Sequence, residues 1–254
     1  MEFSGIEAAC LIVSSAVAVA INTITGGGSL ITLPVLLALG IPLKQAVSVN
    51  MVALAIGGVG SVFGSFKSLR KNSEEHLFIL FPTALGATLG AFLLVITPLN
   101  FLEIIVPVLV LIATLTLFAP QDRWHLKHQW VGAFLAVFLV SVYGGFFGAG
   151  MGVMLVSVLA LFNYGKIHAL NALKNLQQIV INTIAAVILL SGGMVLLEPT
   201  LFMVIGGLIG GYATGRCLEK ISSKHLRTLM ISIGLILSAA LSAHVYFSVS
   251  SGSI

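Results

Sequence analysis

The residues best suited to bind a ligand lie on one apolar, helix-forming stretch in the second half of the chain. Four amides recur there every three or four residues, so they lie on one face of a helix. Lys174 stands beside this amide stripe, and a cation without an acidic neighbour in the sequence favours binding of an anion. Alternatively, the amides form only hydrogen bonds between helices, and the lysine reaches toward the membrane surface. The four amides are Asn171, Asn175, Gln178 and Asn182.

Two glycine-rich segments, one in each half of the chain, are the second candidate part of such a site. Glycine turns that open a helix expose backbone N–H groups and the positive end of the helix dipole, and both favour anions. The other interpretation is that the glycines only let helices pack closely. Asn22 and Thr23 add polar groups just before the first segment. Together these features predict a site for a small oxyanion. The predicted substrate-binding residues are Gly26, Gly27, Gly28, Ser29, Asn50, Gly148, Gly150, Gly152, Asn171, Lys174, Asn175 and Gln178.

The acidic residues, histidines and cysteines are poorly placed for catalysis or for metal binding. All 8 acidic residues lie in connections or at the ends of apolar stretches, so no carboxylate is expected in the middle of the membrane. Among the histidines, only His244 falls within an apolar stretch, near its end. Cys10 and Cys217 have no metal-ligand spacing around them. We therefore expect no enzyme, no cofactor and no metal; a membrane enzyme or a non-transporting sensor is an alternative class.

The elements that position these residues must lie in a membrane. Only 8% of the residues are charged and 58% are hydrophobic, whereas roughly 25% are charged in a soluble domain. Apolar stretches long enough to cross a hydrocarbon core of about 30 Å recur along the chain. The sequence therefore predicts an all-α polytopic membrane protein with 8 full spans and 2 short broken segments. The full spans are 5–24, 45–66, 77–97, 102–119, 130–147, 169–192, 199–215 and 226–248, and the short segments are 29–39 and 151–162.

The basic residues predict which connections face the cytoplasm, and their place in short loops argues against binding of nucleic acid. Lys and Arg cluster near 67–71, 123–127 and 216–227, whereas the connections near 97–102 and 192–199 carry none. The basic loop at 123–127 is predicted to lie inside and the uncharged connection at 192–199 outside, so the chain between them must cross the membrane an odd number of times. The short segment between them then crosses as well, and both termini lie outside. The alternative is that the short segments are re-entrant hairpins between eight full spans.

The two halves of the chain share one order of elements, about 123 residues apart. In each half an apolar helix runs into a glycine-rich segment, a short apolar segment and then a helix with a polar start. We predict two membrane repeats, 1–120 and 121–254, within a single integrated membrane domain. With five crossings each, the second repeat starts on the opposite side of the membrane, so the repeats are inverted. In transporters of this design, broken helices from both repeats meet at the substrate site.

The glycine-rich segments resemble those of a known family. GGGSLITLPVLLALGIPLKQAVSVN occupies 26–50, and GGFFGAGMGVMLVSVLALFNYGKIHALNALKN occupies 144–175. Both are similar to segments of the TauE/SafE family of sulfite exporters, except that Val158 or a neighbour stands where a proline is expected in the second. The resemblance implies movement of sulfite or a related sulfur compound, such as thiosulfate, sulfoacetate or another sulfonate, across the bacterial inner membrane.

These observations predict a secondary transporter that exports a small sulfur-containing oxyanion or organosulfonate by alternating access. No ATP-binding loop is visible in the sequence. An anion channel of similar selectivity would show the same pattern of donors and is the main alternative. Besides the anion and the lipid bilayer, a second copy of the chain in a homodimer is an expected partner.

Overall fold

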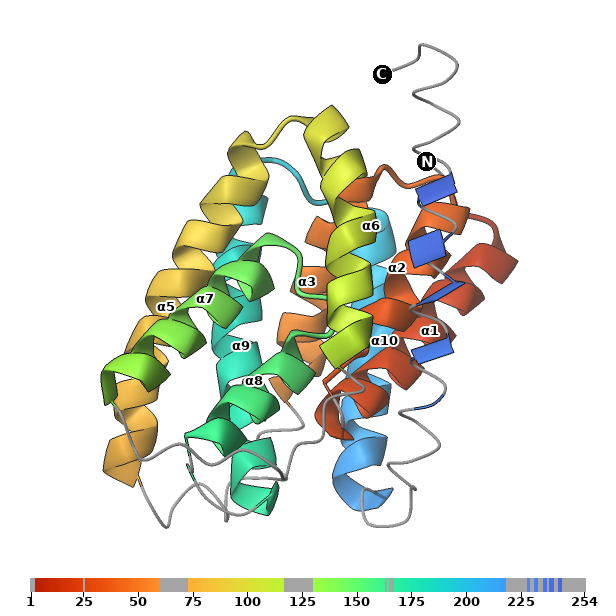
Figure 1. The fold of residues 1–254 in the computed structure, drawn as a ribbon. Helices are drawn as coiled ribbons and strands as arrows, with labels where there is room; N and C mark the ends of the chain where they lie inside the picture. Colours follow the sequence, from red (N-terminus) through yellow and green to blue (C-terminus); the bar gives the residue numbers. More distant parts are fainter. Residues whose placement is uncertain are drawn as a thin grey trace.

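The computed structural model describes most of the apolar part of the chain, and its regular elements are α-helices (Figure 1). The all-α class predicted from the sequence is therefore confirmed for the described residues. These residues are 3–24, 26–59, 73–116, 130–162, 164, 167–217, 228, 231–232, 235–236, 238–239 and 242–243. The helices are α1 (Gly5–Ile24), α2 (Ser29–Ala38), α3 (Leu43–Gly57), α5 (Ser73–Ile96), α6 (Leu99–Thr116), α7 (Trp130–Phe146), α8 (Met151–Leu161), α9 (Ile167–Ser191) and α10 (Leu197–Cys217).

The described helices lie where the apolar stretches of the sequence predict them. α1 has the predicted bounds, and α2 and α8 occupy the two short segments that follow the glycines. Four described helical segments are long and apolar enough to cross a membrane. The predicted last span, 226–248, and the three basic loops lie largely outside the described residues. The four segments are Gly5–Ile24, Phe78–Ile96, Ala169–Ser191 and Leu197–Thr214.

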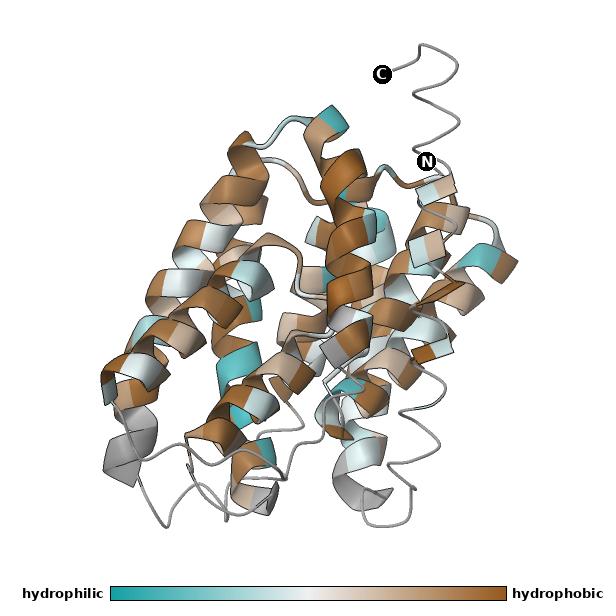
Figure 2. Ribbon diagram, in the orientation of Figure 1, coloured by the Kyte–Doolittle hydropathy of each residue, from teal (hydrophilic) through white to brown (hydrophobic). Residues whose placement is uncertain are grey.

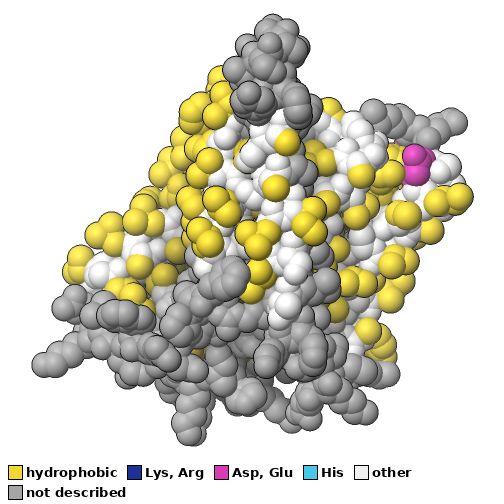
Figure 3. Space-filling view, turned by 45° about the vertical axis from the view of Figure 1, so that its right-hand side comes forward, with side chains coloured by type: hydrophobic (Ala, Val, Ile, Leu, Met, Phe, Trp, Pro, Cys, Tyr) yellow, Lys and Arg dark blue, Asp and Glu magenta, His cyan; other side chains and the backbone are white. Residues whose placement is uncertain are grey.

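The outer surface of the helix bundle is apolar. Hydrophobic residues run along the helices (Figure 2), and their side chains are spread over the described face in Figure 3. Val131, Ile96 and Leu201 are 75%, 72% and 62% exposed. Contact of such a surface with water costs about 25 cal/mol per Å² of apolar area, so this surface suits lipid.

Two pairs of helices approach each other closely through glycines. On α10, Gly206 and Gly210 face α1, where an added Cβ would overlap the carbonyl oxygens of Ile12 and Ala16. Two glycines one turn apart on α5 face α7 in the same way. Small residues allow such backbone contact between membrane helices. The α5 glycines are Gly86 and Gly90, which lie against the carbonyl oxygens of Phe138 and Val142.

Helices α3 and α9 pack against each other between these two pairs. α3 also packs against α10, and α9 against α5. The hydrophilic residues of α9 gather in the lower part of the helix (Figure 2). Because Lys174, Gln177 and Gln178 are all buried, the bundle keeps these groups away from lipid.

Left-handed backbone explains the glycines at the breaks before α2 and α8. Gly26 has a φ of +89°, and Gly148 and Gly150 have φ values of +77° and +71°. Residues with a Cβ adopt this conformation at a cost of about 1–2 kcal/mol. The short helices begin directly after these turns, at Ser29 and Met151.

Several turns meet at one end of the bundle, the upper end in Figure 1. There Lys44 donates from Nζ to the carbonyl oxygens of Val95 at 2.7 Å and Thr97 at 3.0 Å, at the end of α5. The backbone N–H of Phe3 donates to Glu198 Oε1 at 3.3 Å. A cavity between Phe3, Glu198 and the start of α3 lies at the same end. The start of α1, the α2–α3 turn, the end of α5 and the start of α10 are therefore neighbours.

Candidate functional site

The glycine-rich turns of the two halves touch each other through their backbones. The N–H of Gly152, in the first turn of α8, donates to the carbonyl oxygen of Gly26 at 3.1 Å. A Cβ on Gly26 would lie 2.5 Å from the carbonyl carbon of Gly152 and 2.8 Å from the nitrogen of Val153. Neither glycine therefore has room for a side chain, and the start of α8 is fixed against the end of α1.

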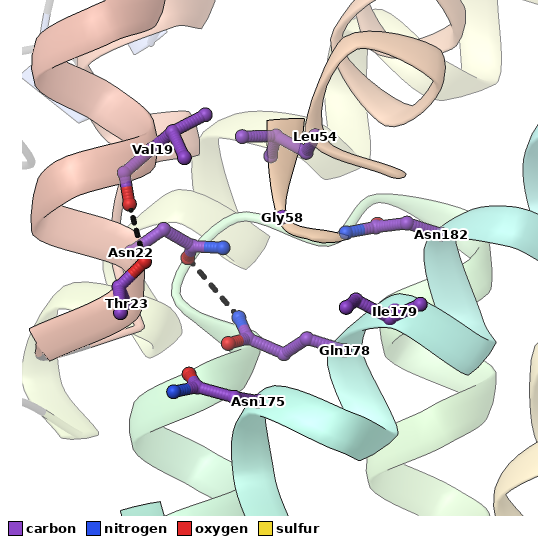
Figure 4. Close-up of a pocket in the computed structure, with 9 residues that line it drawn as sticks. All are labelled: Val19, Asn22, Thr23, Leu54, Gly58, Asn175, Gln178, Ile179 and Asn182. Carbon is purple, nitrogen blue, oxygen red and sulfur yellow. Dashed lines mark hydrogen bonds between the residues drawn. The ribbon is translucent and has the colours of Figure 1, made fainter. Parts of the chain in front are cut away.

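Asn22, in the last turn of α1, connects three helices beside this contact. Its Oδ1 accepts from Gln178 Nε2 on α9 at 3.1 Å, and the two side chains point toward each other in Figure 4. The same oxygen lies 3.4 Å from the backbone N–H of Gly28, which precedes α2. A Cβ on Gly152 would lie 2.7 Å from Gln178 Nε2, so the amide stripe of α9 also borders the start of α8.

Lys174 lies wholly inside the protein, with 0% of its surface exposed. Its Nζ donates to the carbonyl oxygens of Asn22 at 2.9 Å and Thr23 at 3.0 Å. One turn earlier on α9, Asn171 Nδ2 donates to the carbonyl oxygen of Ile24 at 3.3 Å. These carbonyls end α1 and carry the negative pole of its dipole. The lysine is thus held at a helix end, and its ammonium group does not reach the surface of the protein.

Asn50 of α3 holds the first turn of α2. Its Nδ2 donates to Ser29 Oγ at 3.0 Å, and its Oδ1 accepts from Thr32 Oγ1 at 2.6 Å. All three side chains are buried. Buried polar groups need such partners because an unsatisfied one costs about 1–3 kcal/mol. The network fixes the helix start whose backbone N–H groups face the glycine turn.

A small cavity lies between α1, α3 and α9 (Figure 4). Its volume is about 10 Å³, which is roughly the space that one water molecule needs. Asn182 Oδ1 is buried there without a hydrogen-bond partner among the described residues. The cavity therefore offers polar groups in a space smaller than any oxyanion. Its lining residues are Val19, Asn22, Thr23, Leu54, Gly58, Asn175, Gln178, Ile179 and Asn182.

The structure brings the predicted binding residues together at the ends of α1 and α7 and the starts of α2, α8 and α9. Gly26 and Gly152 make the central contact; from α9, Gln178 borders it and Lys174 binds the end of α1. Asn175 lines the cavity, and Asn50 with Ser29 lies on the α2 side of the break. The other predicted residues complete the turns or hold the end of α1; they are Gly27, Gly28, Gly148, Gly150 and Asn171.

Some residues of this region have no distinctive pattern in the sequence. Val19, Leu54 and Ile179 line the cavity but look like ordinary membrane-helix residues. Gln177, which flanks the amide stripe, faces away from the cavity and donates from Nε2 to Thr83 Oγ1 on α5 at 3.0 Å. A lone threonine in an apolar helix carries no signal that would identify it as this partner. Only the helix packing reveals these neighbours.

Comparison with known proteins assigns the sequence of this chain to a family. The family Sulfite exporter TauE/SafE matches residues 11–241 of the chain. A probable membrane transporter protein of Sinorhizobium is 28% identical over 241 residues, which cover 92% of each chain. A probable membrane transporter protein of Haemophilus influenzae is 30% identical over 231 residues, covering 86% of this chain and 88% of the relative.

The same description applies to a relative from Escherichia coli K12. The probable membrane transporter protein YfcA is 25% identical over 233 residues, covering 87% of this chain and 84% of the relative. No solved structure matches the chain. The family match, the relatives and the apolar helices agree with one another. The chain therefore belongs to the sulfite exporter TauE/SafE family and is a multi-pass membrane transporter.

Proposed function

We propose that this transporter exports sulfite or a related small sulfur-containing oxyanion or organosulfonate by alternating access. The observation that carries the proposal is the fully buried Lys174, which is held at the end of α1 and stands beside the amide stripe that borders Gly152. Among the described residues no carboxylate accepts a hydrogen bond from this lysine. A positive charge that has no carboxylate partner in a medium of low dielectric attracts an anion strongly.

In this proposal the anion accepts hydrogen bonds from donors at the two turns that are now bonded to oxygen atoms of the protein. The N–H of Gly152 is bonded to Gly26, and Gln178 and Gly28 point donors at Asn22 Oδ1. Lys174 uses two of its three N–H groups, so one is left to point at the anion. In this proposal Asn171 and Asn175 add amide donors, and the other predicted glycines with Ser29 and Asn50 shape the two helix starts.

The size of the cavity favours a carrier over a channel. A volume of about 10 Å³ holds roughly one water molecule, so the anion binds only after the lining helices move. Movement around a buried site is the basis of alternating access. A channel would instead need a continuous path through the same groups.

We further propose that residues 1–120 and 121–254 form two inverted repeats of five crossings, with both termini outside the bacterial inner membrane. Reciprocal packing supports this: α1 packs on α10 as α7 packs on α5, and α3 packs on α10 as α9 packs on α5. Crossing by α2 also agrees with the position of the α2–α3 turn beside the starts of α1 and α10.

A binding screen tests the anion site directly. Purified protein is heated in the presence of sulfite, thiosulfate, sulfoacetate or taurine, with chloride as the reference anion. A ligand at about 100 times its Kd adds about 2.7 kcal/mol to the free energy of unfolding, which raises the melting temperature. We expect at least one sulfur anion to raise it, and Lys174→Gln to remove that increase.

The matched control is Lys44→Gln, because Lys44 also binds the end of a helix but lies away from the site. This variant should keep the full response to the anion. An equal response in Lys174→Gln and in the wild type would contradict the role of Lys174, and no response to any sulfur anion would contradict the proposed substrate class.

A further inference from the structure

The carbonyl end of α1 is filled by side chains of α9. Lys174 Nζ donates hydrogen bonds to the carbonyl oxygens of Asn22 and Thr23 at 2.9 and 3.0 Å. Asn171 Nδ2 donates to the carbonyl oxygen of Ile24 at 3.3 Å. Every one of these contacts links the first half of the chain to the second. The C-terminal end of α1, beside the proposed transport site, is thus occupied by the ammonium group of Lys174, a cation that belongs to the protein itself.

A helix end of this kind normally attracts a free cation. Carbonyl groups without helical partners and the negative pole of the helix dipole both favour positive charge. In transporters with broken helices, such ends coordinate the Na⁺ that is carried with the substrate. In the described part of the chain, no three His, Cys, Asp or Glu residues lie together to hold a metal ion elsewhere.

We propose that Lys174 is a resident cation, which occupies at the end of α1 the place that a co-transported metal cation takes in other broken-helix transporters. This inference rests on the proposed function and deepens it, because it concerns what accompanies the anion. The ammonium group balances the negative pole at the α1 end with two N–H groups and leaves the third to bind the anion. The transport cycle then needs no Na⁺ or other metal cation at this position.

Lys44 provides the matched control within the same chain. Its Nζ also donates to two carbonyl oxygens at a helix end, those of Val95 and Thr97 at the end of α5. Lys44 is only half-buried, whereas Lys174 has 0% of its surface exposed. Water replaces the ammonium group at an accessible helix end, but it has no comparable access to the end of α1.

Melting of the purified protein tests the inference without any transport assay. A Na⁺ site would raise the melting temperature of the wild type in NaCl relative to N-methylglucamine chloride of equal ionic strength. We expect no difference between these salts. A higher melting temperature in NaCl that persists in Lys44→Ala would overturn the inference.

Removal of the lysine provides the second test. Lys174→Ala exposes the carbonyls of Asn22 and Thr23 and leaves a space the size of the lost side chain. We expect methylammonium, which carries N–H donors, to raise the melting temperature of this variant, and tetramethylammonium, which has none, to leave it unchanged. The wild type and Lys44→Ala should not distinguish the two salts. An equal response of Lys174→Ala to both salts contradicts a resident cation.

Flux measurements separate this inference from the proposed function. In proteoliposomes, we expect sulfur-anion flux through the wild type to be the same in Na⁺ and in N-methylglucamine. Flux through Lys174→Ala should fall at least about tenfold, the ratio that about 1.4 kcal/mol represents, and methylammonium should restore part of it. Flux that requires Na⁺ overturns the resident cation alone. A wild type that carries no sulfur anion contradicts the proposed function, while the melting results still decide the role of Lys174.

Discussion

At the scale of single residues, the contact between Gly26 and Gly152 is the most restrictive feature of the site. The two backbones are joined by a hydrogen bond of 3.1 Å, and a Cβ on Gly152 would lie 2.9 Å from the carbonyl oxygen of Gly26. Gly152 has no positive φ, so its need for glycine comes from space and not from backbone strain. A single methyl group should therefore push the two turns apart.

Gly152→Ala tests this contact. We expect the free energy of unfolding to fall by about 1–3 kcal/mol, the usual cost of overpacking, and anion binding to weaken because Gln178 is displaced as well. The measurement is the melting temperature together with its response to the sulfur anion. Gly5→Ala is the control, since nothing lies within 4 Å of a Cβ at that position. Equal stability of the two variants would show that the turns separate without cost.

The sequence predicts the donors of the site better than their partners. The amide stripe and Lys174 follow from helical spacing and from the lack of an acidic neighbour. The atoms that Lys174 binds are backbone carbonyls of Asn22 and Thr23, and a carbonyl has no signature in a sequence. Only the packing of α9 against the end of α1 shows that the lysine is already bound within the protein.

At the scale of helices, the glycines of α10 and α5 determine which helices pack together. Gly206 and Gly210 bring α10 against the backbone of α1, and Gly86 and Gly90 bring α5 against α7. In a lone helix, replacement of glycine by alanine gains about 1 kcal/mol in helix propensity. Here the added methyl group meets a carbonyl oxygen, so the sign of the effect should reverse.

Gly210→Ala tests that reversal. We expect a lower melting temperature than the wild type, because the Cβ would overlap the carbonyl oxygen of Ala16. Gly5→Ala, within a helix but without a close neighbour, should be neutral or stabilising. Thermal unfolding in detergent compares the two variants directly. A stabilised Gly210→Ala would mean that α1 and α10 are not in contact in the folded protein.

Helix positions could be predicted from hydropathy, whereas helix partners could not. The bounds of α1, α2 and α8 follow from apolar stretches and from the glycines that interrupt them. The helices of the pairs α1–α10 and α5–α7 are not consecutive in the chain. Glycines in a membrane helix indicate that another helix packs closely, but they do not indicate which one. The sequence therefore predicts where the helices lie in the chain, but not which helices pack against each other.

At the scale of the whole molecule, the topology decides whether the two halves are inverted repeats. Ten crossings place the start of α1, the end of α2 and the start of α6 on the outer side. Eight spans with re-entrant hairpins would instead place the start of α1 on the inner side, because α1 and α3 would then be the only two crossings before the basic loop at 67–71. Ser4, Ala38 and Asn100 are exposed at these three positions.

Cysteine labelling separates the two topologies. In a variant without Cys10 and Cys217, we expect Ser4→Cys to react with a membrane-impermeant maleimide on intact cells, as Ala38→Cys should in either topology. Ser68→Cys, in a basic loop that is predicted to be cytoplasmic, should react only after permeabilisation. Protection of Ser4→Cys in intact cells, while Ala38→Cys reacts, would rule out crossing by α2 and with it the inverted repeat.

The most direct test of the central claim is counterflow of a labelled sulfur anion in proteoliposomes that contain the purified protein. A carrier with a single alternating site should accumulate labelled sulfite or sulfonate transiently when unlabelled anion is loaded inside, and the initial rate should saturate. Lys174→Gln should abolish this accumulation while the protein remains folded. Flux that rises linearly with concentration and shows no response to unlabelled anion inside would contradict alternating access and indicate a channel.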